Sequence, residues 1–178
     1  MANQIKLPLV NLCPSALEIK TKDKLIEKLD TPLKLAEFAL KHIGDNRIDC
    51  FIDDILEKSE EYKIMKKVMP SKTPKALQNY QKFYSNYNKE EVDKEIRKIN
   101  AFLADGQYIF HGGKWFNDEK DELVTTRPFS TTLSPQIAVN EALHKGKAYD
   151  NNGIDLFVLE VKILKHLYLF TRIKDKNV

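Results

Sequence analysis

The hydrophobic periodicity of this chain changes at Gly106, and that change constrains the fold more than any other feature. Before this position, apolar residues recur at the spacing of amphipathic helices. After it come short apolar runs, 108–113 ("YIFHGG") and 154–163 ("IDLFVLEVKI"), which are typical of strands. Five of the six glycines lie at or beyond Gly106. The pattern predicts an α+β protein with a helical N-terminal lobe over residues 1–105 and a mixed core over residues 106–178.

The N-terminal lobe is expected to contain helices over residues 30–44, 47–69, 72–88 and 89–106. In the first helix, Thr31 or Asp30 is the expected N-cap and Pro32 lies in the first turn. Pro70 stops the second helix, and Gly106 ends the fourth. The apolar stripes are Leu33, Ala36, Leu40 and Ile43 in the first helix and Val92, Ile96, Ile99 and Leu103 in the last.

The core beyond Gly106 is expected to alternate strands with one helix. Residues 133–146 ("LSPQIAVNEALHKG") predict a helix with Ser134 as N-cap and Pro135 in the first turn. Residues 166–173 ("HLYLFTRI") predict a strand after 154–163. Within 154–163, alternation assigns Leu156, Val158 and Glu160 to one face and Phe157, Leu159 and Val161 to the other.

The composition is that of an ordinary globular protein, and it excludes several classes. The chain has 178 residues, 42% hydrophobic and 31% charged, with a net charge of +3. Lysines alternate with acids, as in "KEEVDKEIRKIN", so a phosphate-binding stripe is not indicated. No apolar run approaches the ~20 residues of a membrane span. The first residues lack the apolar stretch of a secretory signal. We therefore expect no membrane span and a cytoplasmic location, in the producing cell or in a target cell after delivery.

The cysteines and histidines point to no disulfide framework and no metal site. Cys13 and Cys50 are the only cysteines, and Cys50 in "IDCFIDDIL" is expected to be a buried thiol. Two cysteines fit a reducing compartment. The histidines away from the core strand, His42, His144 and His166, lack the spacing of metal ligands.

Two short motifs interrupt these regular patterns. The strand 108–113 ends in His111-Gly112-Gly113, where glycines allow a ligand to approach the backbone and histidine can exchange a proton near neutral pH. Taken alone, this is more often a turn with an exposed histidine. The second motif is the hydroxyl run of 130–132 after Phe129 in "RPFSTTLSPQIA". An N-cap explains only Ser134, so the hydroxyl run predicts a polar shelf for a hydroxyl-rich ligand.

The order of these motifs over residues 107–178 resembles the mono-ADP-ribosyltransferases, in the style of bacterial toxins, injected effectors and phage-encoded enzymes. The shared features are a strand ending in His-Gly, an aromatic-Ser-Thr-Thr run, a helix rich in small residues and a long apolar strand. The resemblance implies a core of two packed, mostly antiparallel sheets with an NAD cleft between them. The helices before it resemble the N-terminal lobe of such proteins in architecture only.

The resemblance also implies roles for individual residues, with NAD as substrate. His111 would contact the nicotinamide ribose or the phosphates, and the backbone of Gly112 would meet the nicotinamide amide. Ser130 would orient the site, and Arg127 would reach a phosphate or remain a surface charge. The implied NAD-binding set is Tyr108, His111, Gly112, Gly113, Arg127, Phe129, Ser130, Thr131 and Thr132. The implied catalytic set is His111, Ser130 and Glu160.

The sequence departs from the family in two ways. It combines the histidine of one branch with the serine-type second motif of another. It also lacks the glutamate that the family carries on a late strand. Either the chain continues past Val178, or the acid comes from elsewhere, or the site is degenerate. The reaction passes through an oxocarbenium-like ribose, so it needs nearby negative charge. Glu160 is the first candidate, ahead of Glu141 in the helix 133–146, and a paired strand glutamate is the ordinary alternative.

The expected function is therefore transfer of ADP-ribose from NAD to a macromolecule, with release of nicotinamide. A protein acceptor is favoured over a nucleic acid, and an antitoxin or a host protein is the expected partner of such a toxin or effector. One alternative is a catalytically incomplete transferase-like domain that acts by binding a protein. Another is a nucleic-acid-binding domain that uses the lysine-rich helices.

Overall fold

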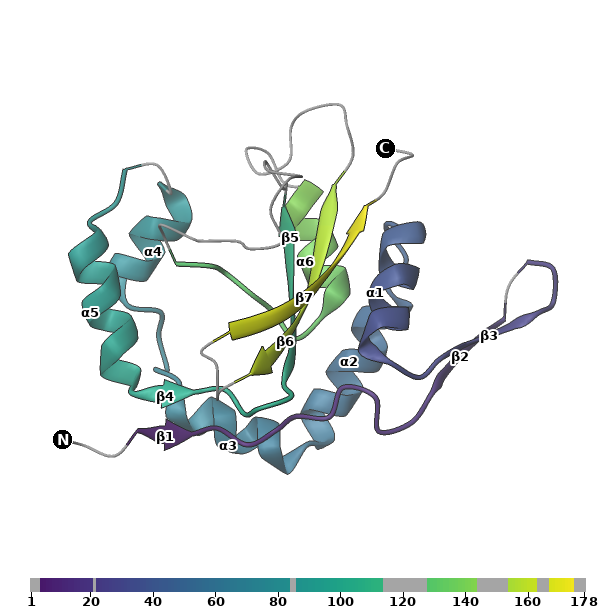
Figure 1. The fold of residues 1–178 in the computed structure, drawn as a ribbon, viewed down its shortest axis with the longest axis horizontal. Coiled ribbons are helices and arrows are strands. Elements are labelled where there is room, and N and C mark those ends of the chain that lie inside the picture. The colour runs from purple at the N-terminus through teal and green to yellow at the C-terminus, as the bar shows by residue number, and fades with distance from the viewer. Residues whose placement is uncertain are drawn as a thin grey trace.

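The computed structural model describes residues 4–20, 22–83, 86–113, 128–143 and 154–162, and the backbone of 167–174. Over these residues the protein is α+β, as predicted, with six helices and three small sheets (Figure 1). The helices are α1 (Pro32–Lys41), α2 (Arg47–Lys58), α3 (Glu60–Val68), α4 (Lys75–Lys82), α5 (Lys89–Ile99) and α6 (Pro135–Leu143). The strands are β1 (Ile5–Lys6), β2 (Leu17–Lys20), β3 (Ile26–Leu29), β4 (Ala101–Phe102), β5 (Tyr108–Gly113), β6 (Asp155–Lys162) and β7 (Leu167–Lys174).

The largest described sheet is antiparallel, with strand order β5-β6-β7. Its strands confirm the three predicted from the apolar runs after Gly106. In the register between β5 and β6, His111 pairs with Phe157 and Tyr108 pairs with Glu160. Cross-strand partners share a face and successive residues alternate, so His111 and Glu160 belong to opposite faces of the sheet. This register decides which of the predicted site residues can meet.

One face of the sheet packs against helices. α6 lies on β5 and β6, and α1 packs against both α6 and β6. The buried side chains of this layer include Phe110, Leu156 and Val158 from the sheet and Phe38 and Val139 from the helices. The opposite face carries a smaller cluster formed by Ile109, Phe157, Leu159 and Val161, with Leu103, Phe129 and Leu133 packed at its margin.

The N-terminal part shares its core with the C-terminal sheet. The fully buried Gln107 accepts a hydrogen bond from the backbone N–H of Val10 at 2.8 Å and donates to the Val10 carbonyl at 3.2 Å. Its amide therefore pairs with the backbone as a neighbouring strand would. The short strands β1 and β4 pair in parallel, and β2 and β3 form an antiparallel ribbon (Figure 1). These strands within residues 5–29 correct the expectation that the first part is helical throughout.

Helix boundaries follow the predicted caps in part. Thr31 caps α1 and accepts a hydrogen bond from the N–H of Lys34. The single helix expected over 47–69 is divided at Ser59, which adopts an extended conformation and caps α3 through its side chain. The helix expected to run to Gly106 ends at Ile99, because Asn100 takes a left-handed conformation with φ 49° and leads into β4.

Some side chains expected in the core are exposed. Leu33 and Ile43 lie at the ends of the α1 stripe and are 37% and 39% exposed, while Leu35, Ala36, Ala39 and Leu40 are buried. Ile96 of α5 is also exposed, whereas Val92 is fully buried. Cys50 is exposed rather than buried, because the inward side of α2 belongs to Ile48, Ile52 and Ile55.

Two further expectations concern the architecture. In the described part of the C-terminal half there is one three-stranded sheet, so the second sheet of the expected core is not among these residues. No described helix has the length and apolar character needed to cross a membrane.

Candidate functional site

The two sequence motifs meet at His111, which is a half-buried residue near the end of β5. Its Nδ1 lies 2.6 Å from the backbone carbonyl oxygen of Ser130, 19 residues further along the chain. A carbonyl oxygen only accepts, so Nδ1 carries the proton and donates this hydrogen bond. The bond fixes the orientation of the ring, and any hydrogen bond from the ring to a ligand would use Nε2.

Two phenylalanine rings pack near the imidazole of His111. The Phe129 ring packs on it with centroids 3.9 Å apart and an interplanar angle of 35°, and the Phe157 ring lies at 5.9 Å. Such a stack limits the rotation of the ring that the hydrogen bond alone would allow. Phe129, which the sequence placed either in the core or on a ligand, thus supports His111.

The second motif is fixed to the edge of the sheet by backbone bonds. The N–H of Phe110 donates to the Thr132 carbonyl at 2.8 Å, and the N–H of Thr132 donates to the Phe110 carbonyl at 2.9 Å. Ser130 and Thr131 immediately precede Thr132 in the chain, and both are exposed. The hydroxyl run therefore lies beside β5, next to His111.

Thr132 and Ser134 join this edge to α6. The Thr132 Oγ1 accepts a hydrogen bond from the N–H of Ser134 at 3.1 Å. Ser134 caps α6, as predicted, because its Oγ accepts from the N–H of Ile137 at 3.3 Å. The same hydroxyl donates to a carboxylate oxygen of Asp49 in the first turn of α2. Thr132 therefore has a structural role, and its side chain is directed to the cap rather than to a ligand.

A tyrosine of the N-terminal lobe also holds the second motif. The hydroxyl of Tyr80 in α4 donates to the Pro128 carbonyl at 2.7 Å, and the Tyr80 ring packs edge-on against Tyr87 with centroids 4.7 Å apart. Pro128 immediately precedes the stacked Phe129. The α4–α5 pair thus reaches the segment that positions His111.

The two glycines beside His111 have different neighbours. A Cβ on Gly112 would lie 1.8 Å from the backbone oxygen of Ala138 and 2.8 Å from the Cβ of Ala142. Gly112 therefore allows α6 to approach β5 and faces the helix layer, away from His111. A Cβ on Gly113 would lie 3.0 Å from His111 Nε2, so the imidazole lies over this glycine. Of the two, Gly113 belongs to the His111 site.

Glu160 and Tyr108 lie on the other face of the sheet. Glu160 forms an ion pair with Lys162, and it pairs in register with Tyr108. Burial raises the pKa of Tyr108, and the Glu160 carboxylate adds to this effect. The structure does not bring either residue to His111. Arg127 lies outside the described residues, and Glu141 is exposed on α6.

Sequence reasoning overlooked Asp155, an acid on the His111 face. Asp155 is only 6% exposed and is the cross-strand partner of Gly113. The alternation of β6 places it with Phe157 and Leu159, on the face of His111 and opposite that of Glu160. The signal was present in the sequence, because the period-two pattern that places Phe157 and Leu159 on one face also places Asp155 there, one step earlier.

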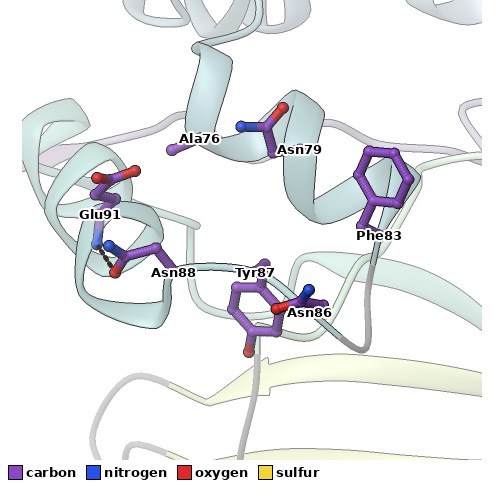
Figure 2. A pocket seen from close by; sticks show the side chains of 7 residues that line it. All are labelled: Ala76, Asn79, Phe83, Asn86, Tyr87, Asn88 and Glu91. Atoms are coloured by element: carbon purple, nitrogen blue, oxygen red, sulfur yellow. Dashed lines mark hydrogen bonds between the residues drawn. The ribbon is translucent and has the colours of Figure 1, made fainter.

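A separate hollow lies between α4 and α5, with a volume of about 230 Å³. Figure 2 shows its described lining residues: Ala76, Asn79, Phe83, Asn86, Tyr87, Asn88 and Glu91. None of the predicted site residues is among them. One of its amides has a local structural role, because Asn88 caps α5 by accepting from the N–H of Glu91 at 3.2 Å (Figure 2).

Within the described part of the chain, no group of three or more histidine, cysteine, aspartate or glutamate side chains is arranged to hold a metal ion.

Comparison with known proteins gives no match among protein families, curated proteins or solved structures. The inference of function therefore depends on the geometry around His111.

Proposed function

We propose that the protein is an NAD-dependent mono-ADP-ribosyltransferase, which transfers ADP-ribose to a macromolecular acceptor and releases nicotinamide. The observation that carries this proposal is the contact between the two motifs, in which the carbonyl of Ser130 orients His111 and Phe129 packs on its ring. The motifs were paired from sequence order alone, and they are separated by a long stretch of chain. Their meeting supports a shared role.

The chemistry of the site suits a hydroxyl-rich ligand. Nε2 of His111 lies on the side of Gly113, and the hydroxyl-bearing residues Ser130 and Thr131, in the segment beside β5, are exposed. Each hydroxyl both donates and accepts, as recognition of a ribose requires. Phe129 stiffens the histidine, which is the preorganisation that a transferase needs.

The proposed reaction breaks the bond between ribose C1′ and the nicotinamide nitrogen. The electron pair of that bond leaves with nicotinamide, and a nucleophilic oxygen or nitrogen of the acceptor bonds to C1′ and loses its proton. Positive charge develops on the ribose, so a carboxylate on the same face accelerates the step. Asp155 is on the His111 face, whereas Glu160 is on the opposite one. Asp155 is thus an acid that the sheet places on the side of His111.

A protein acceptor is favoured by the charge distribution on the helices. Lysines of α1, α2, α3 and α5 pair with acids in the same helix or, for Lys34, with Asp30 just before it, as in Lys63–Glu60 and Lys98–Glu95. These pairs indicate solvent-exposed helix faces of mixed charge rather than the continuous basic stripe that would bind a nucleic acid. As a toxin or effector, the protein would act in the cytoplasm of its producer or of a target cell, with an antitoxin or host protein as partner.

A second candidate function is binding of a protein by a catalytically incomplete transferase-like domain. The position of Glu160 favours it, because the glutamate first proposed as the acid lies across the sheet from His111. Such a domain would retain the two motifs for structural reasons, since Thr132 and Gly112 both serve the packing of α6.

Binding of NAD, measured by calorimetry and by thermal stabilisation, tests the proposal. We expect NAD to bind the wild-type protein and to bind His111→Ala at least ~10-fold more weakly, the equivalent of one lost hydrogen bond to a charged group. Ser130→Ala is the matched variant, because it removes the hydroxyl and keeps the carbonyl that holds His111. Absence of NAD binding to the wild-type protein would reject the transferase and favour the binding domain.

A further inference from the structure

Asp155 and His111 occupy neighbouring positions on one face of the β5–β6 pair. Gly113 is the direct partner of Asp155, and Phe157 is the direct partner of His111. The two polar residues are thus diagonal neighbours, whose Cβ atoms are typically about 7 Å apart. An aromatic side chain such as imidazole covers part of that separation. The sheet therefore places a carboxylate next to the histidine on a face that is otherwise apolar in β6.

Gly113 leaves the space between them without a side chain. The His111 ring extends along the strand until its Nε2 lies 3.0 Å from the point where a Cβ of residue 113 would stand. That point is on the same face as Asp155, directly opposite it in the register. The ring thus leans from its own position toward the position of the aspartate.

The other end of the ring is fixed. Nδ1 donates to the Ser130 carbonyl, and Phe129 packs on the ring face. The imidazole therefore has one orientation, in which Nε2 is the end nearer to Asp155. Asp155 is 6% exposed, so water screens its charge less than it would screen a carboxylate at the surface.

Within the described residues, the register of the sheet shows which charged residues neighbour the pair. Around His111, the described residues of β5 and of 128–132 contribute no acid or base. In β7, Arg172 and Lys174 hold the register positions opposite Phe157 and Asp155. In general, a neighbouring carboxylate raises the pKa of an imidazole and a neighbouring basic group lowers it. Replacing Asp155 alone isolates the contribution of its carboxylate.

We infer that Asp155 is a positioning residue for His111, and that its carboxylate keeps the imidazole protonated near neutral pH across the bare Gly113. A protonated ring donates from Nε2 as well as from Nδ1, so it binds an oxygen acceptor. The ligand atom it fits is a hydroxyl or phosphate oxygen of a dinucleotide. The last step rests on the proposed function, whereas the coupling of the two residues does not.

The coupling is tested by NMR titration of the imidazole signals, with the His111 signal assigned by its loss in His111→Gln. We expect the near-isosteric Asp155→Asn to lower the pKa of His111 by about one unit, because a close carboxylate favours the charged form. Glu160→Gln, on the opposite face, is the matched control and should leave this pKa unchanged. Asp155→Glu should restore most of the shift. An unchanged pKa in Asp155→Asn would overturn the inference.

A second variant and a second measurement distinguish the possible outcomes. If Asp155→Asn does not fold, Gly113→Ala serves instead, since a methyl group between the two residues displaces the ring and should also lower the His111 pKa. An unchanged pKa there would count against the coupling.

The pH profile of nicotinamide release then tests the functional step: the decline of the rate at rising pH should begin at lower pH in Asp155→Asn. A coupled pair in a protein that neither binds nor cleaves NAD would leave the inference standing and reject the transferase.

Discussion

Gly112 and Ala138 are in direct backbone contact, so close that a Cβ on Gly112 would lie 1.8 Å from the Ala138 carbonyl oxygen. The neighbouring glycine differs: the three atoms nearest to a Cβ on Gly113 all belong to the ring of His111, the closest at 3.0 Å. Adjacent glycines of one motif therefore serve different ends. Gly112 fixes the distance between α6 and β5, and Gly113 belongs to the site.

Gly112→Ala and Gly113→Ala should separate these roles. We expect Gly112→Ala to lower the free energy of unfolding by at least ~2 kcal/mol, because α6 must move away from the sheet. Gly113→Ala should cost less, since a side chain rather than a backbone atom has to shift. Thermal unfolding measures both, and 2 kcal/mol corresponds to a drop of about 4–8 °C in Tm for a chain of this size. Equal stability of the two variants would contradict this assignment.

Ser134 should contribute more to stability than an ordinary N-cap. Ser134→Ala removes the cap of α6, worth about 1 kcal/mol, and also the hydrogen bond to Asp49 of α2. Ser59→Ala, at the cap of α3, also removes a cap and a hydrogen bond to a carboxylate, but that carboxylate, Glu61, is exposed and belongs to the same helix. Chemical denaturation of Ser134→Ala, of Asp49→Asn and of their double variant measures the coupling, with Ser59→Ala for comparison. Strict additivity of the two substitutions would exclude a contribution from the Asp49 bond.

Tyr80→Phe should loosen the second motif without disturbing the sheet. The substitution removes the hydrogen bond to the Pro128 carbonyl and keeps the ring contact with Tyr87. We expect a loss of about 1 kcal/mol in the free energy of unfolding. Because Pro128 adjoins the ring that packs on His111, we also expect weaker NAD binding. Tyr87→Phe, which keeps both rings, is the control. Unchanged affinity in Tyr80→Phe would show that α4 does not position the site.

The two cysteines should react at different rates. Burial, with a smaller contribution from Asp30, raises the pKa of Cys13 to about 11, whereas Cys50 is exposed. The thiolate is the reactive form, so iodoacetamide at pH 8 should label Cys50 well before Cys13. Mass spectrometry of the Cys13→Ser and Cys50→Ser variants measures the two rates. Equal labelling of the folded variants would contradict the burial of Cys13.

The raised pKa of Cys13 also gives stability a definite pH dependence. The folded-state pKa exceeds the ordinary value of 9.0, so the folded state retains the thiol proton more strongly than the unfolded chain does. This contribution is complete below about pH 9 and is lost as the pH rises toward 11. Cys13→Ser should therefore flatten the fall in stability over that window in denaturation measured at several pH values.

Local signals in the sequence were sufficient for the core elements of the site. Ser134 and Pro135 predicted the start of α6, and the apolar alternation predicted β5 and β6, because caps and period-two patterns act over a few residues. The meeting of His111 with the Ser130 segment was also expected, although only from the resemblance. These predictions required no knowledge of distant contacts.

The remaining features depend on contacts between residues far apart in the sequence. Gln107 pairs with Val10 across 97 positions, and the short strands β1 and β4 form only because those segments meet. Asn100 ends α5 early, in a conformation that helical periodicity does not encode. Glu160 is the acid that the strand pattern favours, and only the register shows that it pairs with Tyr108, three positions from His111 on β5 and therefore on the other face.

Release of nicotinamide from NAD tests the central claim most directly. The assay compares the wild-type protein with His111→Ala and Ser130→Ala, and with Glu160→Gln as the variant on the opposite face. We predict release by the wild-type protein and by Glu160→Gln, a large loss in His111→Ala, and a smaller loss in Ser130→Ala, which keeps the carbonyl that holds the ring. Release that persists in His111→Ala, or no release by a wild-type protein that is folded and supplied with NAD, would contradict the account.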